Sequence, residues 1–265
     1  MTPQTTPPTA AAIAPPAAAL IAPSMAAPTA GSIAQPTALA LLPAKHRATR
    51  VWDLPTRIFH WALVVCIAGS FITVNLGGNW MPWHFKFGFA VLTLLLFRLV
   101  WGFVGGRWSR FASFIYAPSA VLAYFKGHGK PEQSVGHNPM GAASVFAILG
   151  ILLLQVASGL FSDDEISNQG PLYKFISAAR VSTATWYHKE LGNKIVVALI
   201  ALHIAAIFYY LYKKKDNLIQ PMWQGDKLLT IVAPASRDDA ASRAVAAVVF
   251  ALCALLVWWI VSLGA

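Results

Sequence analysis

The chain has few charged side chains, and acidic residues are especially scarce. Asp, Glu, Lys and Arg make up 11% of its 265 residues, whereas 57% are hydrophobic, and only 10 residues are acidic against 20 that are basic. Soluble domains usually carry a charge on about a quarter of their residues. This composition excludes an ordinary soluble domain and predicts a membrane protein.

Cysteine is also rare. Cys66 and Cys253 are the only two, and both fall within apolar runs. The sequence contains no CxxCH motif, which excludes a covalently attached c-type haem, and no CxxC pair that would indicate zinc or an iron–sulfur cluster. Because the two thiols are expected to be buried in separate membrane helices, we expect no disulfide between them.

Long apolar segments dominate the chain instead. Five of them reach about 20 residues, which is the length of a helix that spans a bilayer. They cover residues 55–76, 84–104, 139–161, 186–212 and 244–264. No strand-like alternation of comparable strength is present. The sequence therefore predicts an all-α transmembrane helix bundle.

Basic residues beside these segments indicate the orientation. They cluster before the first segment, between the second and third, and between the fourth and fifth. The opposite side carries an uncharged turn and the acidic residues Asp163, Asp164 and Glu165, which are either a docking face for a basic redox protein or a solvated turn. Since cytoplasmic loops are rich in Lys and Arg, we expect a multi-pass protein of the bacterial inner membrane with a cytoplasmic N-terminus and a periplasmic C-terminus. The net charge of +10 then reflects topology and contact with anionic lipids rather than nucleic-acid binding.

Residues 1–49 differ from the rest of the chain. They are mostly Ala, Pro and Thr up to Lys45, and prolines interrupt each apolar run. A secretory signal needs a basic region ahead of an unbroken apolar core, and that pattern is missing. We expect this segment to be a disordered cytoplasmic tail.

Four histidines lie within the apolar segments. His188 and His203 share one segment, where their spacing places them roughly 22 Å apart along a helix with about 60° of rotation between them. His60 and His84 belong to two earlier segments. Alternating helix directions put His60 and His203 in the inner half of the membrane, and His84 and His188 in the outer half. Two histidines at each of two depths predict two stacked haems, each with bis-histidine ligation of its iron. Histidines bonded to the backbone or to one another are the alternative, which leaves the matched depths unexplained.

Several motifs, in this order along residues 50–229, resemble the bacterial cytochrome b561 family, which includes the b-type cytochrome subunits of Ni/Fe hydrogenases. They are VWDLPTRIFHWALV, WHFKFGF, FRLVWGFVGG, HNPMGA, SGLFSDDEISNQGPL, and HKELGN followed by LHIAAIFYY. The resemblance implies a four-helix domain at 50–229 that holds two haem b groups, with His60, His84, His188 and His203 as axial ligands. Residues 230–265, a linker and a fifth C-terminal transmembrane helix, have no counterpart in the family core.

Two further charged or titratable residues are candidates for contact with the inner haem. Arg98 lies at membrane depth, where a charge costs about 2.5–3.5 kcal/mol and usually faces a partner. A haem propionate is one candidate partner for this cofactor-binding residue, and snorkelling to the interface is the alternative. For His137 we favour a solvated loop position over contact with an inner propionate or proton transfer to a quinone. Asn138 and Pro139 predict the cap and first residue of the third membrane helix.

Glycines inside the apolar segments have two interpretations. They either allow close packing of helices or leave room for a flat haem ring. Small residues are common at any interface between membrane helices. We therefore favour packing for each of Gly69, Gly88, Gly159 and Gly192.

Two classes of function follow from these observations. In the first, a di-haem cytochrome carries single electrons across the inner membrane between a quinone pool and a periplasmic redox partner such as a cytochrome c. In the second, the bundle is a haem-bearing anchor subunit of a larger dehydrogenase or hydrogenase complex. A transporter or sensor without haem is a weaker third class. No catalytic nucleophile, Walker loop or carboxylate pair is present, so the only enzymatic activity considered is quinone oxidation or reduction. A second copy of the chain, as a homodimer, is a further candidate partner.

Overall fold

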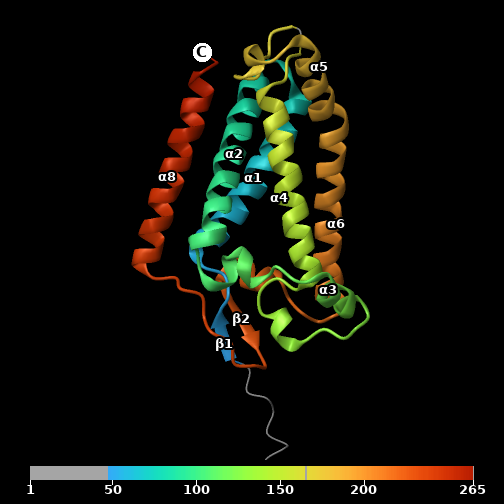
Figure 1. Cartoon of the computed structure of the whole chain (residues 1–265), viewed down its shortest axis with the longest axis vertical. Coiled ribbons are helices and arrows are strands. Elements are labelled where there is room, and N and C mark those ends of the chain that lie inside the picture. Colours follow the sequence, from blue (N-terminus) through green and yellow to red (C-terminus); the bar gives the residue numbers. More distant parts are fainter. Residues whose placement is uncertain (1–46, 165, 265) are drawn as a thin grey trace, which may run out of the picture. The chain divides into compact units, whose positions relative to one another are not determined.

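Five long helices form the body of the fold (Figure 1). The computed structural model describes residues 47–164 and 166–264. Within them the helices long and apolar enough to span a membrane are α1 (Leu54–Leu76), α2 (Met81–Val104), α4 (Pro139–Leu160), α6 (Asn193–Tyr212) and α8 (Ala240–Ser262). The predicted all-α bundle with five membrane helices is confirmed. The fourth span begins earlier than predicted, because α5 (Ala178–Trp186) and a π-helix (Tyr187–Gly192) lead directly into α6.

A small sheet ties the start of the first membrane helix to the segment that follows the fourth. Strand β1 (Arg47–Arg50) pairs antiparallel with β2 (Asp226–Leu229), with Arg50 opposite Asp226. Residues 47–49, which the sequence analysis assigned to the tail, therefore belong to a strand. The rest of the predicted tail lies outside the described residues.

Short elements connect the long helices. Helix α3 (Pro118–Phe125) lies between α2 and α4, and α7 (Ile219–Gln224) precedes β2. Tight 3-10 turns cover Gly78–Trp80, Arg107–Ser109, Phe111–Ser113, Pro131–Ser134 and Tyr173–Phe175. Asn138 caps α4 as predicted, since its side chain accepts a hydrogen bond of 2.8 Å from the backbone N–H of Gly141.

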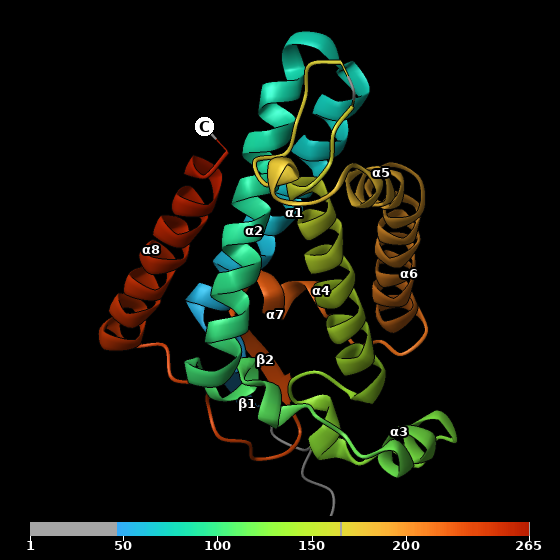
Figure 2. The ribbon, with the colours of Figure 1, turned by 45° about the horizontal axis from the view of Figure 1, so that its top comes forward.

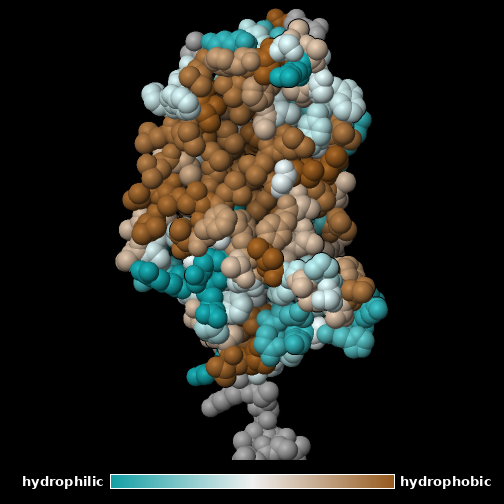
Figure 3. All heavy atoms as spheres, viewed as in Figure 1, coloured by the Kyte–Doolittle hydropathy of each residue, from teal (hydrophilic) through white to brown (hydrophobic). Residues whose placement is uncertain are grey.

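Helix α2 lies at the centre of the packing. It contacts α1, α4 and α8, whereas α6 packs mainly on α4. Half of the α2 span is buried inside the protein, against 6% of the span that contains α6. Most apolar side chains of α6 therefore face outward, as expected for a lipid-facing helix. Figure 3 shows a broad hydrophobic region over the helices with hydrophilic residues gathered toward the two ends, which is the surface of a multi-pass membrane protein.

The fifth membrane helix lies beside α2, on the side away from α4 and α6 (Figures 1 and 2). Its buried residues are Ala246, Cys253 and Val257. Phe250 also packs edge-on against Phe97 of α2, with ring centroids 6.1 Å apart. Cys253 and Cys66 are both free thiols.

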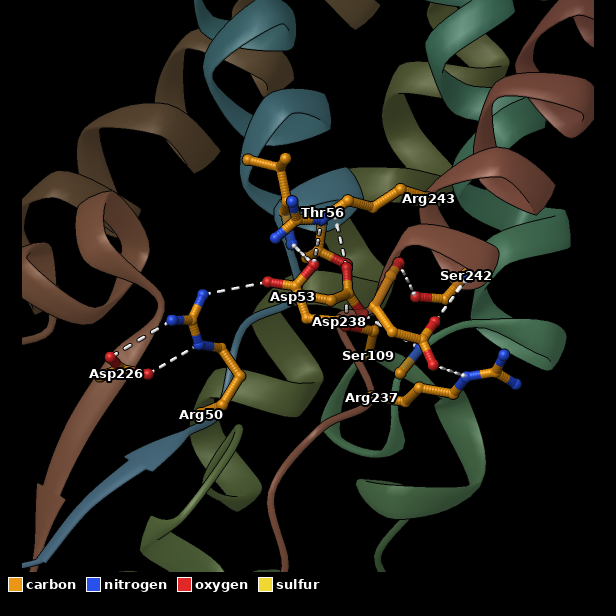
Figure 4. Close-up of polar contacts among 12 residues, drawn as sticks. Arg50, Asp53, Thr56, Ser109, Asp226, Arg237, Asp238, Ser242 and Arg243 are labelled. Carbon is orange, nitrogen blue, oxygen red and sulfur yellow. Dashed lines mark hydrogen bonds and ion pairs between the residues drawn. The ribbon is translucent and has the colours of Figure 1, made fainter.

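Asp53 fixes the start of α1 against the end of α2. This aspartate is fully buried, and a buried carboxylate must be paired or hydrogen-bonded. As the N-cap of α1 it accepts from the N–H of Thr56 at 2.8 Å. It also accepts from Trp101 Nε1 at 3.2 Å and from the N–H of Gly106 at 3.0 Å. Ser109 Oγ donates to it at 2.7 Å (Figure 4). A side chain at Gly106 would collide with this carboxylate.

A second polar cluster holds the linker to α8. Arg50 pairs with Asp226 at 2.7 Å and with Asp238 at 3.0 Å, and Asp238 also pairs with Arg243 at 2.9 Å (Figure 4). Burial alone would raise the pKa of Asp238, but hydrogen bonds from Arg243 and from the N–H of Leu54 lower this pKa below its ordinary value. Asp238 therefore stays ionised and joins the starts of α1 and α8.

Candidate functional site

His84 of α2 and His188 of the π-helix face each other across the bundle. Their ring centroids are 6.1 Å apart and their planes are nearly perpendicular, at 81°. His84 Nδ1 lies 3.0 Å from the carbonyl oxygen of Ser70, and His188 Nδ1 lies 2.8 Å from that of Gln155. An imidazole that donates from Nδ1 to a carbonyl keeps a lone pair on Nε2, which is the form that binds metals.

The separation of these two rings fits a metal ion between them. A bond from a metal to an imidazole nitrogen is about 2 Å long. Two such bonds, with the distance from each nitrogen to the centre of its own ring, give a centroid separation of about 6 Å. The observed centroid separation of 6.1 Å is thus compatible with axial ligation of one iron by both rings.

A cavity of about 610 Å³ surrounds His84 and His188. Pockets that bind ligands of drug or cofactor size have volumes of about 300–1,000 Å³. Its walls come from α1, α2, α4 and the start of α6, and they are largely apolar. The apolar lining includes Ile67, Phe71, Phe89, Leu152, Val156 and Val196. Size and lining both suit a flat, largely apolar cofactor such as haem.

Two of the four glycines singled out in the sequence line this cavity. A side-chain carbon built on Gly88 would have nothing within 4 Å, so Gly88 faces open space rather than a neighbouring helix. One built on Gly159 would lie 2.8 Å from His188 Cε1, so this glycine makes room for the His188 ring. The predicted role in packing fits Gly69 and Gly192, which lie against aromatic rings, but it is wrong for Gly88.

Helix α4 sets the position of His188 through Gln155. The π-helix that contains His188 is a conformation that often marks functional sites. The side-chain amide nitrogen Nε2 of Gln155 donates to the carbonyl oxygen of His188 at 2.9 Å, and the backbone carbonyl oxygen of Gln155 faces His188 Nδ1. Backbone position and ring orientation are thus fixed together. Sequence reasoning missed Gln155, although an amide side chain within an apolar segment was an available signal.

The other two predicted ligands lie nearer the end of the bundle that carries the sheet. His60 of α1 and His203 of α6 are half-buried and close enough to interact electrostatically. His60 Nδ1 is buried and has no hydrogen-bond partner within the described residues. The structure therefore brings His84 and His188 together, whereas an electrostatic interaction alone relates His60 to His203. Ligation of iron by either pair stays a prediction.

Arg98 is enclosed toward the C-terminal end of α2. Its side chain is 3% exposed, and its guanidinium lies 4.8 Å from the centre of the Phe111 ring. The snorkelling alternative is wrong, because a snorkelling side chain keeps its charged head in water. The packing of the 3-10 turn that carries Phe111 over α2 closes this route.

His137 is not the solvated loop residue that we favoured from the sequence. Its ring lies between Trp52 and Phe114, with centroid distances of 4.6 Å and 4.5 Å. Its Nδ1 is buried and without a hydrogen-bond partner in the part of the chain that the structure describes. The sequence interpretation failed because these two aromatic rings come from distant segments that close over the loop.

The acidic cluster is partly a structural turn. Hydrogen bonds from the side chain and the backbone of Asn168 hold the pKa of Asp164 far below its usual range. Asp164 also accepts from the N–H groups of Ile166 and Ser167. Glu165 lies outside the described residues. A docking role for this cluster stays a prediction.

A membrane helix bundle with two facing histidines that line one apolar cavity is the arrangement expected of a membrane cytochrome b. A model of the family described as prokaryotic cytochrome b561 matches residues 51–225, which is more than half of the chain. The protein belongs to the prokaryotic cytochrome b561 family, as the sequence motifs predicted.

Two relatives of the chain are described as b-type cytochrome subunits of Ni/Fe hydrogenases. The chain is 25% identical over 143 residues to the probable Ni/Fe-hydrogenase 1 B-type cytochrome subunit of Escherichia coli, covering 43% of this chain and 60% of that protein. It is 24% identical over 213 residues to the probable Ni/Fe-hydrogenase B-type cytochrome subunit of Bradyrhizobium diazoefficiens, covering 67% and 85%. The match to the Escherichia coli protein thus spans about three fifths of its length. No solved structure matches the chain.

Proposed function

We propose that the protein is a di-haem b-type cytochrome subunit that accepts electrons from a Ni/Fe-hydrogenase-like partner and passes them to a quinone pool in the membrane. The observation that supports it best is the His84–His188 pair, whose centroid distance of 6.1 Å and Nδ1 hydrogen bonds suit axial ligation. A bound haem b supplies one-electron redox chemistry. The names of the relatives favour this function over transfer of electrons to a cytochrome c.

In this proposal the chain's own residues hold, orient and enclose two haems. His84 and His188 hold one, and the carbonyls of Ser70 and Gln155 fix the two rings in the tautomer that leaves Nε2 free. The apolar walls of the cavity exclude water, which together with the axial ligands sets the potential of the site. His60 and His203 hold the second haem.

The positive-inside rule orients the two sites. With the basic loops in the cytoplasm, the N-terminus is cytoplasmic, the C-terminus is periplasmic, and His84 and His188 lie toward the periplasm. The outer site is then the entry point for electrons from a partner that docks on the periplasmic side. The inner site is the second stepping stone across the membrane.

The test is a haem count per purified chain, followed by reduction of the haems in membranes with H₂ as the only reductant. We expect two low-spin haem b groups that acidic organic solvent extracts, since the sequence has no CxxCH. H₂ should reduce them only where a Ni/Fe hydrogenase of the same organism is present. One haem or none would overturn the di-haem proposal. Two haems that quinol reduces but that H₂ never reduces with the hydrogenase present would instead favour electron transfer between a quinone pool and a periplasmic redox partner.

Removal of the fifth helix is expected to leave both haems in place. None of the residues that line the described cavity belongs to α8, which packs on the opposite side of α2. A chain that ends at Asp239 should therefore show the same haem count and the same reduced-minus-oxidised spectrum as the full chain. A truncated protein that inserts normally but lacks one haem would show that α8 completes a haem site.

A further inference from the structure

Arg98 is a buried cation whose donors are not fully used. Only 3% of its side chain is exposed, and its Nη1 has no hydrogen-bond partner among the residues that the structure describes. A buried charge is costly unless it is paired and hydrogen-bonded. The ring of Phe111 makes a cation–π contact with the guanidinium, but a phenyl ring has no oxygen or nitrogen that could accept a hydrogen bond from the Arg98 N–H groups. The site therefore lacks an anionic acceptor.

Asp53 is not the anionic acceptor that Arg98 lacks. Arg98 interacts electrostatically with Asp53. However, the two carboxylate oxygens of Asp53 are engaged by Thr56, Trp101, Gly106 and Ser109, which cap α1 and hold the end of α2. Asp53 compensates the charge of Arg98 from a distance and leaves Nη1 open.

His137 supplies a second unused polar nitrogen at the same place. Its Nδ1 is buried without a partner within the described part of the chain, and its ring is clamped between Trp52 and Phe114. His137 interacts electrostatically with Arg98, and also with His203 and His60. Phe111 contacts both the Arg98 guanidinium and the ring of Phe114, which in turn contacts His137, so one aromatic cluster holds both side chains in place.

We propose that Arg98 and His137 together bind a propionate carboxylate of the haem held by His60 and His203. This inference rests on the proposed function. A carboxylate accepts several hydrogen bonds, and those from a guanidinium are charge-assisted. The propionate supplies the negative charge that the buried guanidinium lacks, and His137 donates a second hydrogen bond to it. The two residues thereby fix the rotation of the inner haem and neutralise its carboxylate.

The experiment is a spectroelectrochemical titration of the purified holoprotein carrying Arg98→Gln or His137→Phe. Without the guanidinium, the negative propionate stabilises the ferric state, so the inner haem is expected to titrate at a lower potential. We expect about a tenfold change in the equilibrium between its reduced and oxidised forms for Arg98→Gln, which is about 59 mV for a one-electron couple. His137→Phe should keep the packing between the two rings and give a smaller shift in the same direction. The outer haem should not change in either variant.

The matched control is Arg110→Gln, which removes an exposed arginine that follows α2. It should leave both potentials unchanged. A direct readout is the infrared difference spectrum of reduction with haem labelled with ¹³C at the propionate carboxyls, whose bands should shift in both variants and not in the control. Should Arg98→Gln fail to accumulate, His137→Phe carries the test, because the buried arginine stays in place.

Unchanged potentials and unchanged carboxyl bands in a variant that retains both haems would overturn this proposal while the proposed function stands. If instead His60→Ala loses no haem component that the wild-type protein has, the proposed function itself is refuted. A shift of the outer rather than the inner component would also overturn the proposal, since it would place the anion at the other site.

Discussion

Replacing His188 by Ala is expected to remove one of the two haems and to abolish the same spectral component that His84→Ala abolishes. The two ring centroids lie 6.1 Å apart, so in the proposed function an iron between them would have both as ligands and would lose six-coordination when either is removed. Haem count and the reduced-minus-oxidised spectrum of each purified variant measure the effect. His60→Ala and His203→Ala should abolish the other component.

A role in ligation differs from a merely structural role in its response to added imidazole. In His188→Gly, free imidazole is expected to enter the space of the lost side chain and to restore a low-spin spectrum. His128→Ala, at a loop position away from both pairs, is the matched control and should retain both haems. If His60→Ala and His84→Ala removed one common component, the pairing would be wrong. Failure of imidazole to restore any signal in a variant that inserts normally would argue against ligation by His188.

The membrane helices and the four histidines are predictable because their signals are local. Span length and hydropathy are read within one segment, and a histidine is conspicuous among apolar neighbours. The direction of each helix then assigns a depth to each histidine. His84 and His188 therefore emerge as a pair from the sequence, and the structure places their rings 6.1 Å apart with nearly perpendicular planes.

Features that depend on contacts between distant segments were not predictable. Strands β1 and β2 have four residues each, which is too short to show an alternation, and they are separated by almost the whole bundle. The enclosure of the His137 ring requires Trp52, which precedes α1, and Phe114, which follows a 3-10 turn. The π-helix at His188 has no sequence period that distinguishes it from the α-helix around it, and the hydrogen bond from Gln155 to its backbone comes from another helix.

Gly88→Phe is expected to exclude the haem held by His84 and His188 while the inner haem remains. A side chain at this position meets nothing within 4 Å because Gly88 borders the cavity of about 610 Å³. A phenyl ring placed there occupies volume that the outer haem needs. The ring is rigid and the surrounding helices are close-packed, so a movement that makes room for both would be energetically costly. The haem count should fall from two to one, and the lost spectral component should be the one that His84→Ala removes.

Gly150→Phe is the matched control for this substitution. Gly150 lies in α4, also has nothing within 4 Å of an added side-chain carbon, and is exposed on the outside of its helix rather than on the cavity wall. The same increase in volume is therefore expected to leave both haems bound. Equal loss of haem in the two variants would mean that a large side chain disturbs the bundle in general. Retention of both haems in Gly88→Phe would mean that the cavity beside His84 does not hold the outer haem, because the phenyl ring and the macrocycle compete for one space.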